Sequence, residues 1–200
     1  MINNPQGIEY DKIVDLALNV LIDYNIYDFP LNIEIITEKL NIKLNPYSKL
    51  SSNEYEEFYK VAPLGFTSIN QYNDKHCDYT IFYNDINYNN ENNRFTIAHE
   101  IGHVVSGDIG STITEKEEKL YDYFAKCLLA PQCLIISNKE FDINTVVTKY
   151  KISKQVADNW LHAIISRKSS YGENCLTNIE KQYIEEMKKY HNHPPASNRL

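Results

Sequence analysis

The chain has 200 residues, which suits one domain or a domain with a small appendage. Its formal net charge of −7 argues against general nucleic-acid binding, although the charge is uneven: residues 1–138 carry 10 basic and 20 acidic side chains, and residues 139–200 carry 10 and 7. The sequence shows neither a secretion signal nor an apolar run long enough to span a bilayer, so we expect a cytoplasmic protein without a membrane segment.

Helices and short strands are both predicted in the first half of the chain. Apolar residues at helical spacing predict helices, and alternating or β-rich runs predict strands. The predicted elements are helices at 10–24, 32–40 and 51–59, a short strand at 42–44, and two β-rich runs at 64–69 and 79–83. A polar segment joins the two β-rich runs, so we expect them to pair as antiparallel strands.

The next predicted helix, residues 93–106, carries the sequence His-Glu-Ile-Gly-His at positions 99–103. Asn92 or Asn93 would cap its start, and Gly107 would end it. Two histidines four residues apart lie on one face of a helix and can bind one metal ion. Glu100 then lies beside the open coordination position and can accept a proton from water. This pattern is typical of a zinc-dependent protease.

A third metal ligand is expected from the following helix, residues 114–130, which Pro131 ends. Catalytic zinc usually has three protein ligands and one position left for water. Glu118 is the preferred candidate because it lies one helical turn before Asp122, whose carboxylate could hold the second ring nitrogen of a histidine ligand. Glu117 is the main competitor, and acidic residues here could also simply complement the helix dipole.

The last part of the chain is predicted to be helical, with segments at 144–150, 153–166 and 177–190 before a disordered tail at 191–200. The first two segments resemble a helix-turn-helix (HTH). Few of their side chains suit phosphate contacts, so direct nucleic-acid binding is disfavoured, and these helices could instead support the metal domain or bind its substrate. We place the catalytic domain at 1–136 and the HTH-like extension at 137–190. The four cysteines lack CxxC spacing, which excludes a cysteine-zinc ribbon.

Residues 94–131 resemble the ImmA/IrrE family of metallopeptidases. The family pattern is approximately Arg-Phe-Thr-x-Ala-His-Glu-x-Gly-His followed by Glu-x-x-Ala-Asn-x-Phe-Ala-x-x-Leu-Leu-x-Pro. The chain matches it at 94–96, 98–100, 102 and 103, and then at 118, 124, 125, 128, 129 and 131. Two positions depart from it, because Tyr121 replaces a small alanine and Asp122 replaces the usual asparagine.

The resemblance implies an α+β fold: a mostly helical, zincin-like metallopeptidase domain with a small antiparallel sheet and a C-terminal helical extension. It also implies a Zn²⁺ endopeptidase with His99, His103 and Glu118 as ligands and Glu100 as general base. Related proteins cleave an HTH repressor, usually encoded nearby, and so act as anti-repressors for a phage or mobile element. The alternatives are a repressor-binding module without catalysis and an HTH DNA-binding regulator on the same fold. A third is a zinc hydrolase that acts on a small molecule.

One of the predicted strands is a candidate for the edge of the substrate cleft. In zinc proteases an edge strand beside the cleft can pair with the main chain of the substrate. Residues 79–84 are the sequence candidate for that edge, with a purely structural strand as the equally weighted alternative.

Overall fold

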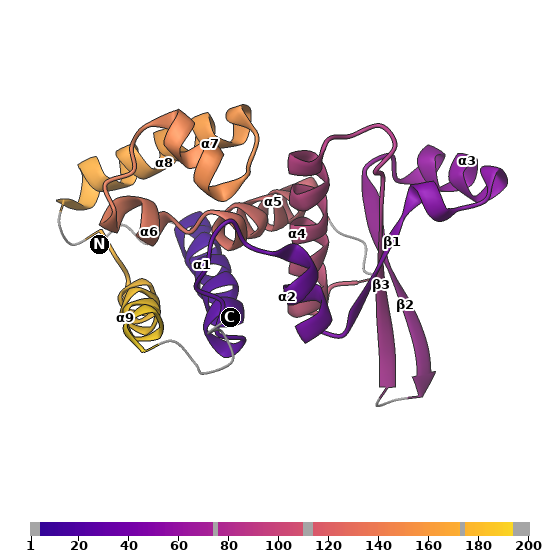
Figure 1. Ribbon diagram of the computed structural model, residues 1–200, viewed down its shortest axis with the longest axis horizontal. Helices are drawn as coiled ribbons and strands as arrows, with labels where there is room; N and C mark the ends of the chain where they lie inside the picture. Colours follow the sequence, from indigo (N-terminus) through magenta and orange to yellow (C-terminus); the bar gives the residue numbers. More distant parts are fainter. Residues whose placement is uncertain (1–4, 74–75, 110–113, 173–174, 194–200) are drawn as a thin grey trace. The chain divides into compact units, whose positions relative to one another are not determined.

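The computed structural model describes residues 5–73, 76–109, 114–172 and 175–193 (Figure 1). The chain divides into two compact units. One contains residues 1–13 and 32–125, and the other contains residues 14–31 and 126–200. Among the described helices, none has both the length and the apolar character needed to cross a bilayer. The domain boundary expected after residue 136 stays a prediction.

The expected helices and strands are present, with ends shifted by a few residues. In chain order they are α1 Pro5–Asp23, α2 Ile33–Lys39, β1 Ile42–Pro46, a 3-10 turn Tyr47–Lys49, α3 Ser52–Val61, β2 Gly65–Asn73, β3 His76–Tyr83, α4 Asn90–Ser106, α5 Glu115–Leu129, α6 Gln132–Ser137, α7 Ile143–Tyr150, α8 Lys154–Tyr171 and α9 Asn178–Asn192. Helix α9 runs two residues into the segment expected to be a disordered tail, of which residues 194–200 lie outside the described residues.

Local capping explains several of these ends. Ser51 caps α3 in a reciprocal capping box with Glu54. Helix α4 is capped by Asn89, so the expectation that Asn92 or Asn93 would cap it is wrong. The helix starts earlier because the Asn89 side chain already satisfies the backbone N–H of Asn92 at 2.9 Å. Gly107 ends α4 as expected, with a φ of 80° in the left-handed region.

The sheet of the first unit is mixed, with strand order β1-β3-β2. Strands β2 and β3 form the expected antiparallel pair, with Thr67 opposite Ile81, but β1 pairs with β3 in parallel. The expected α+β fold class is confirmed, and its small sheet is mixed instead of antiparallel. The assignment of residues 79–84 as an edge is wrong, because β3 has a neighbour on both sides. The edge strand that follows α3 is β2.

Helix α4 packs against β2 and β3, while α2 contacts β1 and α4. The apolar core of this unit includes Ile81 and Ile101, both fully buried. Gly65 lets β2 come close to α4, because a Cβ atom there would lie 2.9 Å from Cγ2 of Thr96 and 2.5 Å from the carbonyl oxygen of Phe82. This close approach places the start of β2 against the motif-bearing helix.

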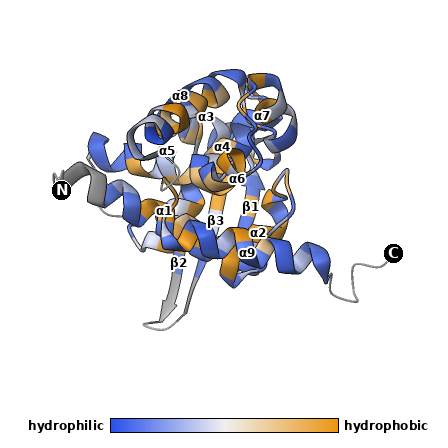
Figure 2. Ribbon diagram, turned by 90° about the vertical axis from the view of Figure 1, so that its left-hand side faces the viewer, coloured by the Kyte–Doolittle hydropathy of each residue, from blue (hydrophilic) through white to orange (hydrophobic). Residues whose placement is uncertain are grey.

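The second unit is helical in its described part, and α7 and α9 are amphipathic; Figure 2 shows both apolar and polar segments along α9. Its core centres on Trp160, whose indole N–H donates to the carbonyl of Ala130 at 2.8 Å. Lys151, with a φ of 52°, ends α7 and begins the short turn that leads to α8. Cys127, Cys133 and Cys175 are buried and unbridged.

Candidate metal centre

Helix α4 presents the three residues of the motif at one end of a cavity. His99 and His103 are one turn apart and therefore lie on the same helical face. His103 is 7% exposed and Glu100 is 9% exposed, so both polar side chains are largely withdrawn from solvent. Buried polar groups are costly unless they have partners. The chain provides these partners from α5 and β2.

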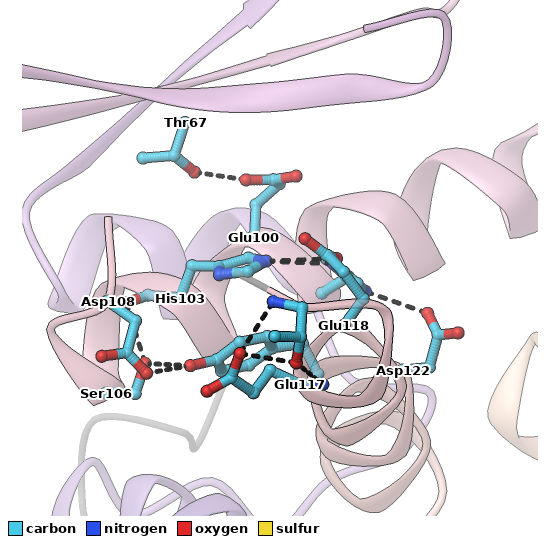
Figure 3. Close-up of polar contacts among 11 residues, drawn as sticks. Thr67, Glu100, His103, Ser106, Asp108, Glu117, Glu118 and Asp122 are labelled. Carbon is cyan, nitrogen blue, oxygen red and sulfur yellow. Dashed lines mark hydrogen bonds and ion pairs between the residues drawn. The ribbon is translucent and has the colours of Figure 1, made fainter. Parts of the chain in front are cut away.

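Helix α5 brings Glu118 to both histidines (Figure 3). Glu118 Oε2 lies 3.1 Å from Nε2 of His99 and 3.8 Å from Nε2 of His103, and the two Nε2 atoms lie 3.1 Å apart. One possible ligand atom from each of the three residues lies within 4.8 Å of the other two. Tetrahedral zinc with ligand bonds of 2.0–2.1 Å separates its ligand atoms by about 3.3 Å. Two imidazole nitrogens and a carboxylate oxygen at this spacing fit a divalent metal ion such as zinc.

Glu117 does not face the histidines. Its Oε2 accepts hydrogen bonds from the backbone N–H and the hydroxyl of Thr114, both at 2.7 Å. These bonds lower the pKa of Glu117 and tie this carboxylate to the N-terminus of α5. The structure thus brings together Glu118, rather than its competitor Glu117, with the two histidines.

Asp122 lies one turn after Glu118 and faces the other side of the His99 ring. Its Oδ1 is 2.9 Å from Nδ1 of His99, so Nδ1–H would donate to Asp122 and leave Nε2 to face the centre. Burial lowers the pKa of His99, but the Asp122 hydrogen bond and the charges of Glu100, Asp122 and Glu118 outweigh it, and the net pKa is raised. The aspartate therefore fixes the ring orientation.

Glu100 is held from the opposite side by the sheet. The hydroxyl of Thr67, on β2, donates to Glu100 Oε2 at 2.7 Å (Figure 3). Burial raises the pKa of Glu100, although the Thr67 bond and the charge of His99 lower it in part. A buried carboxylate beside two histidines that could bind a metal ion can exchange a proton with a bound water.

A cavity of about 560 Å³ opens over these groups. Its lining comes from the end of α3, the first residues of β2, and the polar faces of α4 and α5. The lining residues are Val61–Thr67, Phe95, Thr96, His99, Glu100, His103, Asp108, Ile109, Glu118 and Asp122. The strand at the cavity is thus the edge strand β2, through Gly65, Phe66 and Thr67, instead of the segment 79–84.

The sequence does not predict three features of the site. The Thr67 hydroxyl bonds Glu100, Asp108 lines the cavity, and the Tyr121 ring centroid lies 3.9 Å from that of His103. Thr67 lies in a β-rich run that was recognised, but its partner is 33 positions away and no local pattern links them. Tyr121 stood out only as a departure from the family pattern.

The match to known proteins covers this whole centre. The family model of the IrrE N-terminal-like domain, peptidase family M78, matches residues 60–162, which include every residue of the centre described above. No curated protein matches the chain. The match spans half of the chain and agrees with the resemblance seen in residues 94–131. The chain therefore belongs to the IrrE N-terminal-like family of metallopeptidases.

Proposed function

We propose that the protein is a zinc-dependent endopeptidase, with His99, His103 and Glu118 as the zinc ligands and Glu100 as the general base. The observation that carries the proposal is the group of three ligand atoms within 4.8 Å, next to a buried carboxylate, in an open cavity. Two histidines and one glutamate form the ligand set of a catalytic zinc site, in which the remaining position is left for water or substrate.

When bound, zinc supplies Lewis acidity and makes water a better nucleophile at neutral pH. Glu100 removes the proton of the attacking water and later delivers it to the leaving nitrogen of the peptide bond. Thr67 keeps the Glu100 carboxylate in place through its 2.7 Å hydrogen bond. Asp122 keeps the His99 ring in one orientation through Nδ1.

The substrate is proposed to be an HTH repressor encoded near the gene of this protein, as the family resemblance implies. Two features of the chain support a basic protein substrate. Asp108 lines the cavity, and residues 1–138 carry a net charge of −10. Among the described residues β2 pairs only with β3, so its other edge could receive an extended segment of the substrate as an additional strand. Since repressors act on DNA, we expect the protease to work in the cytoplasm.

The test is incubation of the purified protein with the neighbouring regulator, with and without a chelator, together with measurement of bound metal. We expect one or a few cleavage products, about one zinc per chain, and loss of cleavage on chelation. Glu100→Gln should keep the zinc and lose at least about 100-fold in rate. Glu117→Gln is the matched control and should cleave normally, because Glu117 is bonded to Thr114.

Two outcomes would contradict the proposal. Cleavage that persists in Glu100→Gln would show that another group or a contaminant does the chemistry. Full derepression in cells by the Glu100→Gln variant would instead favour a module that sequesters the repressor without cutting it.

A further inference from the structure

The two histidines of the centre are supported in different ways. On His99, the ring nitrogen that faces away from the centre is held by Asp122 at 2.9 Å. For His103, the hydrogen bonds of the described residues include a contact at Nε2, which faces His99, and none at Nδ1. A histidine ligand usually needs a partner that fixes its ring. Some other contact must therefore orient His103.

The ring of Tyr121 provides that contact. Its centroid lies 3.9 Å from the His103 ring centroid, with 40° between the ring planes, whereas the His99 and His103 rings are 5.0 Å apart. Tyr121 is 4% exposed, so this contact is shielded from water. Aromatic rings in contact interact favourably beyond the area that they bury. His103 is thus held by ring packing where His99 is held by a carboxylate.

Tyr121 is itself fixed at both ends. Its hydroxyl donates to Oδ2 of Asp108, just after the end of α4, and lies 3.0 Å from Oγ of Ser106. Its ring edge lies against Gly102, where an added Cβ would come within 3.0 Å of Tyr121 Cδ1. Ser106 in turn donates to the carbonyl of His103 at 3.1 Å. The tyrosine therefore connects α5 to the last turn of the motif helix.

We propose that Tyr121 is a positioning residue that orients His103 for metal binding. Residues at positions 118, 121 and 122 occupy neighbouring positions on one face of α5. One turn of this helix would then supply the Glu118 ligand and the groups that orient both histidine ligands. The inference rests on the proposed function, because it assumes that His103 is a ligand.

The experiment measures zinc affinity by competition with a chromophoric chelator, using folded apo-protein and no substrate. Tyr121→Leu should bind zinc at least 10-fold more weakly, within the 10- to 100-fold range typical for loss of a group that supports a ligand. Tyr121→Phe keeps the ring and should stay within about threefold of the unchanged protein. Tyr123→Leu is the matched control on the same helix, since the Tyr123 ring packs on the ring of Tyr10.

A second readout separates orientation from general stability. The visible spectrum of the Co²⁺-loaded protein reports ligand geometry, and it should change in Tyr121→Leu but not in Tyr123→Leu or Tyr121→Phe. If Tyr121→Leu does not fold, Tyr121→Met, with a flexible side chain of similar reach, is measured in its place.

The outcomes distinguish the two proposals. Zinc affinity of a folded Tyr121→Leu or Tyr121→Met variant within threefold of the unchanged protein would overturn the role of Tyr121 alone. An equal loss in Tyr123→Leu would also overturn it, because the effect would then be unspecific. An unchanged protein that binds no zinc would instead overturn the proposed function, and this inference with it.

Discussion

Thr67 and Glu100 form the contact on which the proposed acid–base chemistry of the centre depends. Glu100 is nearly buried, and the hydroxyl of Thr67 is 2.7 Å from its Oε2. A hydrogen bond to a charged group contributes about 1.5–3 kcal/mol. A rotated Glu100 carboxylate would no longer reach the attacking water, since proton transfer requires hydrogen-bond distance.

We predict that Thr67→Val lowers kcat by at least about 10-fold and leaves zinc content unchanged, because valine keeps the shape of threonine without its donor. Thr67→Ser keeps the hydroxyl and should retain most of the activity. Steady-state kinetics on the regulator substrate, with metal analysis of each variant, checks this. An unchanged kcat in Thr67→Val would mean that the hydrogen bond does not orient the base.

Individual residues of the centre differed in how far the sequence revealed them. His99, Glu100 and His103 are neighbours on one helix, so their spacing alone predicts that they share a face. Glu118 and Asp122 required a second assumption, that α5 packs against α4. Thr67 and Asp108 could not be inferred, because their roles arise from contacts between elements that no periodicity records.

At the level of the elements, helices were easier to predict than strand pairing. The start of α3 after Ser51 and the end of α4 at Gly107 have local signals in the sequence, and both lie within one residue of the expected positions. The parallel pairing of β1 with β3 joins Ile42 to Tyr79 across the 3-10 turn, α3 and β2, so it depends on packing that is distant in sequence. For the same reason the edge strand was assigned to the wrong segment.

The packing of α4 on α5 leads to a prediction at Gly102. A Cβ there would lie 3.0 Å from ring atoms of both Tyr121 and Phe124, which are buried. Alanine would gain about 1 kcal/mol of helix propensity, but overpacking a well-packed core costs about 1–3 kcal/mol. We expect Gly102→Ala to lower the free energy of unfolding by about 1 kcal/mol overall, measured by urea denaturation of the apo-protein.

A double-mutant cycle tests whether the rings cause this loss. Combining Gly102→Ala with Tyr121→Leu should reduce the cost of the alanine, because one of the two opposing rings is removed. Ser166→Ala, at an exposed position on α8, is the control and should change stability by less than about 0.5 kcal/mol. A stabilising Gly102→Ala would indicate that the two helices are less tightly packed at this point.

At the scale of the whole molecule, the chain divides into two compact units. Every residue of the metal centre belongs to the unit of residues 1–13 and 32–125. In the other unit, a buried polar network ties three segments together. The Arg167 guanidinium donates to Glu180 at 2.5 and 2.7 Å, to Gln132 at 2.9 Å, and to the carbonyl of Cys175. Glu180 also accepts a hydrogen bond from the backbone N–H of Thr177, the N-cap residue of α9.

This network leads to the last prediction. Glu180 is 1% exposed, so Arg167→Met would leave a buried carboxylate without its bidentate cation, at a cost of about 3–5 kcal/mol. Lys119→Met is the control: the ion pair of Lys119 with Glu115 is largely exposed, and its loss should leave the free energy of unfolding essentially unchanged. Urea denaturation measures both, and zinc affinity of the folded Arg167→Met protein should be unchanged, since the network contains no residue of the metal centre. If Arg167→Met lowers the free energy of unfolding by less than about 1 kcal/mol, the Arg167–Glu180 pair contributes no more than a surface ion pair. Weakened zinc binding in this variant would show that the two units are energetically coupled.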